Sequence, residues 1–141
     1  MQEFDIAEKD SISKMQKIFD VQGNQTVESI HKKLGKIIWD YCGMSRNEKG
    51  LKKALELVDD IKKEFWETVK IPGKFESFNT ELDKAGRVID FIELGDLMIR
   101  DALNRKESCG GHFREESQTE TGEAKRIDDK YSYVSAWEYK N

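Results

Sequence analysis

The residues best suited to chemistry in this sequence lie between positions 105 and 115. Cys109 and His112 have a Cys-x-x-His spacing that could serve a metal, and Arg114 carries a guanidinium that binds carboxylates in bidentate fashion. Because imidazole titrates near neutral pH, His112 and Arg114 could together supply a proton donor and an anion clamp. A catalytic pair would still need a pocket and a cofactor. We therefore favour a structural interpretation, in which both side chains make polar contacts at a domain junction.

A four-ligand zinc site would have to add His31 and Cys42 to that pair. These two residues lie on one predicted helix, about 16 Å apart along its axis, so they cannot share an ion that needs four converging ligands. The sequence therefore predicts no metal site. It also disfavours a disulfide between Cys42 and Cys109, because two cysteines without a secretory leader suggest a reducing, cytoplasmic compartment.

Gly110 and Gly111 match neither of the glycine patterns that cradle phosphate, and no strand pattern precedes them. The chain is therefore not expected to hold a flavin by the usual route. Two consecutive glycines predict instead a sharp turn of the backbone out of the preceding helix. The neighbouring acidic pair, Glu115 and Glu116, is expected to be merely solvated.

Composition restricts the fold and the partners. The chain has 141 residues, of which 37% are charged and 37% hydrophobic, with a formal net charge of −4. This length favours one domain of slender amphipathic helices around a modest core. The mixed charges argue against a nucleic-acid partner, and no apolar run approaches the ~20 residues of a membrane-spanning helix.

Hydrophobic periodicity predicts three long helices within residues 26–106. Thr26 and Asn47 are expected to begin the first two, and the third is expected to run from Asn79 or Thr80 to about Lys106. Joined by short turns, they predict an all-α fold: an antiparallel three-helix bundle, up-down-up like a spectrin repeat. The inward positions are Val27, Ile30, Leu34, Ile37, Ile38 and Tyr41; Leu51, Ala54, Leu55, Val58, Ile61 and Phe65; and Leu82, Ala85, Ile89, Ile92, Ile99 and Leu103.

The segments on either side of the bundle look less regular. Residues 1–25 read as a lead-in segment with a short helix that Ser11 caps. Residues 107–141 read as an irregular C-terminal loop followed by a short aromatic tail, with β character from Tyr131 to Tyr139. Within the third helix, Gly86 and Gly95 are expected to allow close helix packing. Outward aromatic residues, Trp66 among them, suggest a surface that another domain covers.

Two stretches carry a resemblance to a known family. The segment from Trp39 to Asn47 and the residues after the third helix resemble, in order and spacing, the C-terminal helical domain of the succinate dehydrogenase and fumarate reductase flavoprotein subunit. The resemblance covers roughly residues 26 to 139. Most family members carry arginine and alanine where this chain has Cys109 and Gly111. The residues expected to dock against a neighbouring domain are Arg105, Glu107, Ser108, Gly110, Gly111, His112 and Arg114.

The resemblance implies that the chain is part of a longer enzyme. In the family, this bundle packs against a flavin-binding domain, and the covalent FAD, the dicarboxylate site and the catalytic arginine lie in preceding domains. The chain alone is then expected to bind no cofactor and to be catalytically silent. The implied partners are the flavin-binding domain, an iron-sulfur subunit and a membrane cytochrome or quinone subunit. These would place it peripherally on the cytoplasmic face of the inner membrane, in succinate-fumarate electron transport.

Two alternatives stay open. The C-terminal bundle of L-aspartate oxidase carries a similar serine, arginine, glycine and histidine signature. From a different class, a free-standing helical interaction module would use the aromatic tail and the acidic surface to bind a partner, and its His112 loop would be dispensable.

Overall fold

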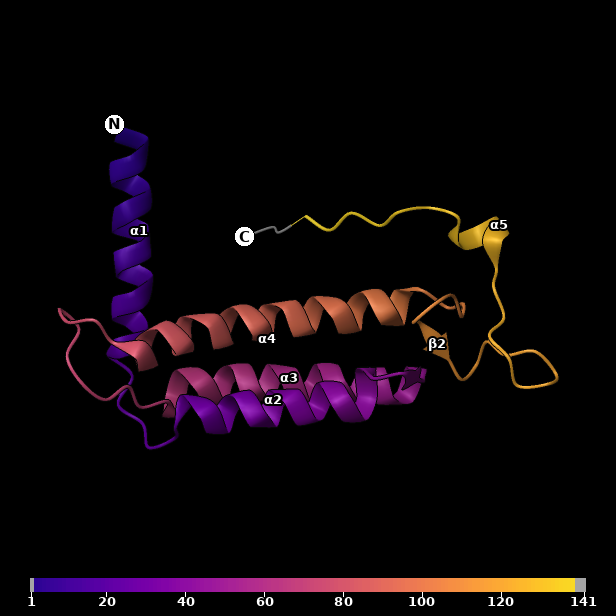
Figure 1. The fold of residues 1–141 in the computed structure, drawn as a ribbon, viewed down its shortest axis with the longest axis horizontal. Helices are drawn as coiled ribbons and strands as arrows, with labels where there is room; N and C mark the ends of the chain where they lie inside the picture. Colours follow the sequence, from indigo (N-terminus) through magenta and orange to yellow (C-terminus); the bar gives the residue numbers. More distant parts are fainter. Residues whose placement is uncertain (1, 139–141) are drawn as a thin grey trace.

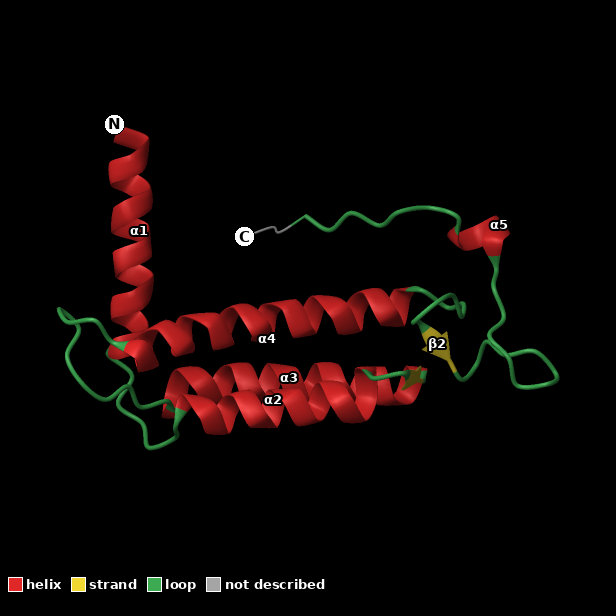
Figure 2. Cartoon of the chain, viewed as in Figure 1, coloured by secondary structure: helices red, strands yellow, loops and turns green. Residues whose placement is uncertain are grey.

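The computed structural model describes residues 2–138, and helices dominate it (Figure 2). Three long helices, α2 (Val27–Cys42), α3 (Glu48–Thr68) and α4 (Thr80–Asn104), lie side by side as an antiparallel bundle (Figure 1). The predicted all-α, up-down-up three-helix bundle is confirmed.

Polar caps begin each bundle helix where the sequence places them. The Thr26 hydroxyl accepts from the Ser29 amide at 3.1 Å, and the Asn47 side chain accepts from the Gly50 amide at 2.7 Å. Asn79 accepts from two amides of the first turn of α4. Because these amides have no partner within the helix, each cap contributes about 1 kcal/mol. The three predicted helix starts are confirmed.

The core lies along the axis of the bundle and is built from the predicted apolar stripes. Every inward position named from the periodicity is either buried or packed against the buried cluster. Each fully buried aliphatic or aromatic side chain contributes roughly 1.5–3 kcal/mol through burial. The structure adds Val88, Ala102 and Cys42, which the periodicity did not include.

Both glycines inside α4 admit neighbouring side chains, but the predicted close approach within the bundle is confirmed for Gly95 only. A Cβ at Gly95 would lie 3.3 Å from Ile38 Cδ1 of α2, tighter than an ordinary contact. A Cβ at Gly86 would lie 3.0 Å from Met15 Cε, which belongs to the N-terminal segment rather than to the bundle. Gly95 therefore allows α2 and α4 to pack closely, and Gly86 allows the N-terminal segment that contains Met15 to pack on α4.

The N-terminal helix α1 (Gln2–Phe19) is longer than predicted and projects away from the bundle near the start of α4 (Figure 1). The prediction that Ser11 caps a short helix is wrong. The Ser11 hydroxyl donates to the Ala7 carbonyl one turn earlier, while Glu3 and Asp5 in the first turn favour a helix start upstream.

The segment after α4 is more ordered than the predicted irregular loop. Strand β2 (Phe113–Arg114) pairs in parallel with β1 (Ser45–Arg46), which lies between α2 and α3. The β character predicted for the aromatic tail is wrong over residues 131–138, and Tyr139 lies outside the described residues. Tyr131 belongs to the short helix α5 (Asp128–Tyr131), and no strand is assigned to residues 132–138. The described part of the tail does not extend the two-stranded sheet of β1 and β2.

Candidate functional site

The predicted site residues gather at the end of the bundle where α2 passes into α3 and α4 ends. We call residues 43–48 and 105–117 together the corner. Their link is the parallel pairing of β1 with β2, in which Ser45 lies opposite Phe113 and Arg46 opposite Arg114. The Glu115 amide extends the pairing by donating to the Arg46 carbonyl at 2.8 Å. The two stretches that carried the family resemblance thus form one structure.

The turn predicted at Gly110 and Gly111 is confirmed. Cys109 and His112 exchange two backbone hydrogen bonds, of 2.8 and 3.1 Å, and close a tight turn around the glycines. Gly110 has φ +58°, a left-handed conformation that costs other residues roughly 1–2 kcal/mol. Gly111 needs no such conformation. The turn brings His112 back alongside the end of α4.

Arg114 is a buried charge, only 2% exposed, and it closes the C-terminal end of α4. One terminal nitrogen donates to the Ala102 carbonyl at 2.9 Å and to the Leu103 carbonyl at 3.3 Å, and Nε pairs with Glu116 at 3.0 Å. The last carbonyls of a helix lack partners and carry its negative dipole end, so a guanidinium satisfies both. Arg114 therefore binds the chain's own backbone.

Ser108 and Glu107 are also buried and hold the corner closed. The Ser108 hydroxyl accepts from the Arg114 amide at 2.8 Å and donates to its carbonyl at 3.2 Å. The Glu107 carboxylate accepts from Arg105 at 2.7 Å and from the Ile127 amide at 2.8 Å. Buried polar groups are stable only when they are satisfied in this way.

His112 is held on both sides of its ring. Its Nδ1 lies 2.9 Å from an Arg46 terminal nitrogen, and its Nε2 lies 2.9 Å from the Arg105 carbonyl. Since arginine only donates, Nδ1 accepts and Nε2 carries the proton, which makes the imidazole neutral. Burial lowers the pKa of His112, the Arg105 carbonyl raises it, and the charges of Arg46, Arg114 and Arg105 lower it further. The geometry suits a structural imidazole better than a proton donor.

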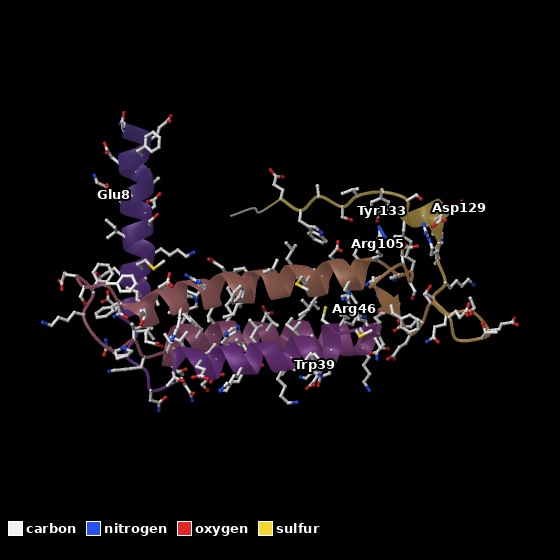
Figure 3. All side chains as sticks on the ribbon, in the orientation of Figure 1. Glu8, Trp39, Arg46, Arg105, Asp129 and Tyr133 are labelled. Carbon is white, nitrogen blue, oxygen red and sulfur yellow. The ribbon has the colours of Figure 1, made fainter. Side chains whose placement is uncertain are left out.

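Arg105 connects the corner to the tail. It donates to the Tyr131 carbonyl at 3.0 Å and to the Tyr133 carbonyl at 3.2 Å, and its guanidinium lies within 6 Å of both ring centroids. Farther along, the Trp137 indole donates to Asp101 of α4 at 2.9 Å. Figure 3 shows Arg105 and Tyr133 together above the end of α4. The tail is thus laid along the outer face of α4.

Several corner residues were missed as site candidates. Glu115 accepts from the Ser45 hydroxyl at 2.8 Å and from Asn47 at 2.9 Å, and Glu116 accepts from the Glu48 amide at the start of α3. The prediction that this acidic pair is merely solvated is wrong. Arg46 was noted only within the resemblance. A carboxylate at a helix N-terminus is favourable. The sequence does not show that Glu116 lies at the start of α3, because that placement depends on the pairing of β1 with β2.

The other chemical candidates lie apart from the corner. His31 stacks on Phe91 with ring centroids 5.4 Å apart. Both cysteines are free thiols, and burial raises the pKa of Cys42. Within residues 2–138, no group of three or more His, Cys, Asp or Glu side chains is arranged to hold a metal. Trp66 faces outward beside the fully buried Phe65, as predicted.

Comparison with known proteins identifies the family. The family described as fumarate reductase flavoprotein C-term matches residues 31–141. An uncharacterised FAD-dependent oxidoreductase of Methanocaldococcus jannaschii is 34% identical over 110 residues, which are 78% of this chain and 19% of that protein. The fumarate reductase flavoprotein subunit of Haemophilus influenzae is 23% identical over 110 residues, 78% of this chain and 18% of that protein. The chain thus spans about a fifth of the length of these curated relatives.

Solved structures share the fold. The FrdA subunit of an Escherichia coli quinol fumarate reductase variant superposes with a TM-score of 0.76 at 20% identity, over 90% of this chain and 21% of that one. Mycobacterium smegmatis Sdh1 in complex with UQ1 gives a TM-score of 0.73 at 23% identity, over 80% of this chain and 19% of that one. The family match includes α3, α4 and the whole corner. The chain therefore belongs to the fumarate reductase flavoprotein C-terminal family, as the resemblance in its sequence implied.

Proposed function

We propose that this chain is the C-terminal helical part of an FAD-dependent flavoprotein that interconverts succinate and fumarate, and that it supports the flavin-binding part without taking part in the chemistry. The family match over residues 31–141 carries the proposal. Relatives named as FAD-dependent oxidoreductase and as fumarate reductase flavoprotein subunit support the cofactor and the reaction.

The described residues do not fit FAD, so we assign the cofactor to the rest of the enzyme. Dinucleotides bind where a strand leads through a glycine-rich loop into a helix, with the pyrophosphate at the helix N-terminus. Within residues 2–138, the one sheet is the pair of two-residue strands β1 and β2. The Gly110–Gly111 turn leads into β2 and not into a helix. The chain itself contributes a helical bundle whose corner is held together by buried hydrogen bonds.

We also propose the division of residues 1–25 as lead-in segment, 26–106 as three-helix bundle and 107–141 as signature loop and tail. Among the docking candidates, Arg105 at the end of the bundle and Gly110, Gly111 and His112 in the loop keep some exposed surface. Glu107, Ser108 and Arg114 are buried within the chain, so they support docking by shaping the corner.

The wider partners follow from the same proposal. A related structure is titled as a quinol-fumarate reductase with menaquinol molecules, and the Mycobacterium smegmatis protein is in complex with UQ1. We propose an iron-sulfur subunit and a membrane quinone subunit as partners, and a peripheral position at the cytoplasmic face of the membrane. No helix among the described residues has the length and apolarity to cross a bilayer.

The test compares the purified chain with the assembled enzyme. The chain alone is expected to carry no flavin absorbance and to give no fumarate-dependent oxidation of reduced viologen, while the flavoprotein that contains it shows both. Turnover by the isolated chain would contradict the proposal. So would a preparation in which the chain is assembled with its natural partners and no flavin is present.

A further inference from the structure

A groove lies at the C-terminal end of α2, lined in part by Trp39, Met44, Ser45, Arg46 and Gly111. We call it the Trp39 groove. Of the described residues that line it, only Arg46 carries an ionised side chain, because burial raises the pKa of the Cys42 thiol. The groove is therefore an apolar surface with one positive charge.

The charge balance of the corner leaves Arg46 without a counter-ion. Arg105 pairs with Glu107, and Arg114 pairs with Glu116. Arg46 donates only to neutral acceptors: the Gly43 carbonyl at 2.8 Å and His112 Nδ1 at 2.9 Å. Within residues 2–138, no carboxylate lies within ion-pair distance of Arg46.

Acidic groups of the neighbouring segments have other partners. Asp101 of α4, which lines a second pocket together with Arg46, accepts from the Trp137 indole at 2.9 Å. Glu115 accepts from Ser45 and Asn47, and Asp40 pairs with Lys36 at 2.9 Å. Arg46 is half-buried, so part of its hydration is lost without compensation by a carboxylate. Nε and one terminal nitrogen of Arg46 already donate to Gly43 and His112, so a planar carboxylate from outside would pair with the remaining N–H groups of the two terminal nitrogens.

The walls of the groove have the composition of a protein interface. Trp39 is 83% exposed and Met44 is 89% exposed. Single exposed apolar residues are ordinary, but tryptophan, methionine and arginine together are residue types enriched at protein interfaces. A Cβ at Gly111 would meet nothing within 4 Å, so a partner's main chain can approach the turn. Figure 3 shows Trp39 on the outward side of α2 and Arg46 at the corner end of the bundle.

We propose that the Trp39 groove receives a carboxylate-bearing segment of the flavin-binding part, with an aspartate or glutamate paired to Arg46 and apolar contacts to Trp39 and Met44. This inference rests on the proposed function. The groove lies within the family-matched residues, and the chain spans about a fifth of its curated relatives, so most of the surface available to cover it belongs to the rest of the enzyme. The single positive charge selects a carboxylate within that surface.

The test measures amide hydrogen exchange in the isolated chain and in the purified flavoprotein that contains it. The amides of residues 43–46 and 110–112 are expected to exchange at least about tenfold more slowly in the assembled enzyme. Arg46→Gln is expected to abolish that gain, whereas Arg46→Lys retains part of it because the charge stays and the planar fork is lost. The matched control is Arg87→Gln, an exposed arginine of α4 paired with Asp83, which should leave the gain unchanged.

A second variant guards against misfolding, because Arg46 also contacts Gly43 and His112. Trp39→Ala removes an exposed side chain without disturbing the core and is expected to reduce the protection in the assembled enzyme only. Equal exchange of residues 43–46 in the isolated chain and in an assembly that contains flavin would overturn this inference and leave the proposed function standing. An assembly that contains no flavin would contradict both this inference and the proposed function. Protection that appears in the isolated chain as its concentration rises would assign the groove to a second copy and overturn the inference.

Discussion

The corner and α1 are attached to the same bundle in opposite ways. In the corner, Glu107, Ser108 and Arg114 are polar or charged and almost completely buried. In α1, residues 2–14 are exposed, and the attachment consists of Met15, Ile18 and Phe19 packed against the core, with one exposed ion pair from Lys14 to Asp90 of α4 at 3.3 Å. The corner is thus fixed by directional hydrogen bonds, and α1 mainly by a small apolar contact at one end, because an exposed ion pair adds little.

The difference shows what each kind of attachment tolerates. Burying a polar group is costly unless every donor and acceptor finds a partner, and in the described part of the chain no buried side-chain nitrogen or oxygen lacks one. A network of this kind is therefore sensitive to the loss of any member. An apolar contact is not directional, so it is sensitive mainly to lost volume.

The largest expected effect is that of Arg114→Gln. The substitution removes a buried guanidinium, leaves the last carbonyls of α4 without their donor, and leaves Glu116, which is half exposed, with the Glu48 amide. We expect a loss of about 2–3 kcal/mol in the free energy of unfolding, measured by urea denaturation. Arg87→Gln on the exposed face of α4 should cost no more than about 0.5 kcal/mol. Equal effects of the two variants would remove the distinction between corner and surface.

The turn offers a sharper comparison within the corner. Gly110→Ala places a side chain at φ +58° and should cost roughly 1–2 kcal/mol, although nothing lies within 4 Å of the added Cβ. Gly111→Ala, whose Cβ also meets nothing, should be nearly neutral. Thermal unfolding of both variants distinguishes backbone strain from steric crowding as the cause of a lower stability. A loss of stability in Gly111→Ala similar to that in Gly110→Ala would contradict the turn geometry.

The pH dependence of stability tests the neutral state of His112. Because burial lowers the pKa of His112 in the folded chain, the unfolded chain takes up a proton more readily. The neutral His112 ring therefore makes its full contribution to the free energy of unfolding above the unfolded-state pKa of about 6.5. This contribution is lost as pH falls from there towards the lower pKa of the folded state. We expect the free energy of unfolding of the wild type to decline as pH falls below about 6.5, and to decline less in His112→Gln. Parallel curves for the two proteins would count against a neutral imidazole.

The smallest effect is expected in α1. Phe4 is 81% exposed, so Phe4→Ser should change the free energy of unfolding by less than about 0.5 kcal/mol. Ile18→Val, at the buried end of the same helix, should cost about 0.5–1.5 kcal/mol. Urea denaturation of the pair tests whether α1 is held at one end only. A marked loss in Phe4→Ser would show that its exposed part packs against something in solution.

Most of the bundle could be predicted because its signals are local. Periodic apolar positions and the caps Thr26, Asn47 and Asn79 act within a few residues of one another, so they can be recognised along the chain. The prediction for α1 was wrong because Ser11 can cap a helix or bond within one, and the sequence does not show which.

Only part of the membership of the site could be predicted. Gly110, His112 and Arg114 were recognised, but the buried state of Arg114 and the roles of Glu115 and Glu116 depend on the pairing of β1 with β2. Two strands of two residues leave almost no periodic signal. The aromatic tail was assigned β character on propensity, which the hydrogen bonds of Arg105 and Trp137 override.

The sequence by itself determined the three bundle helices, their order and the family, because helix caps, apolar stripes and a spaced motif are all properties of neighbouring residues. Only the tertiary structure decided which charges are paired. Arg105 and Arg114 find carboxylates two residues away, whereas Arg46 contacts His112 across the corner and has no carboxylate partner among residues 2–138. The physical reason is that charge pairing depends on distance in space, and the distances between the segments of the corner are set only when the bundle brings them together.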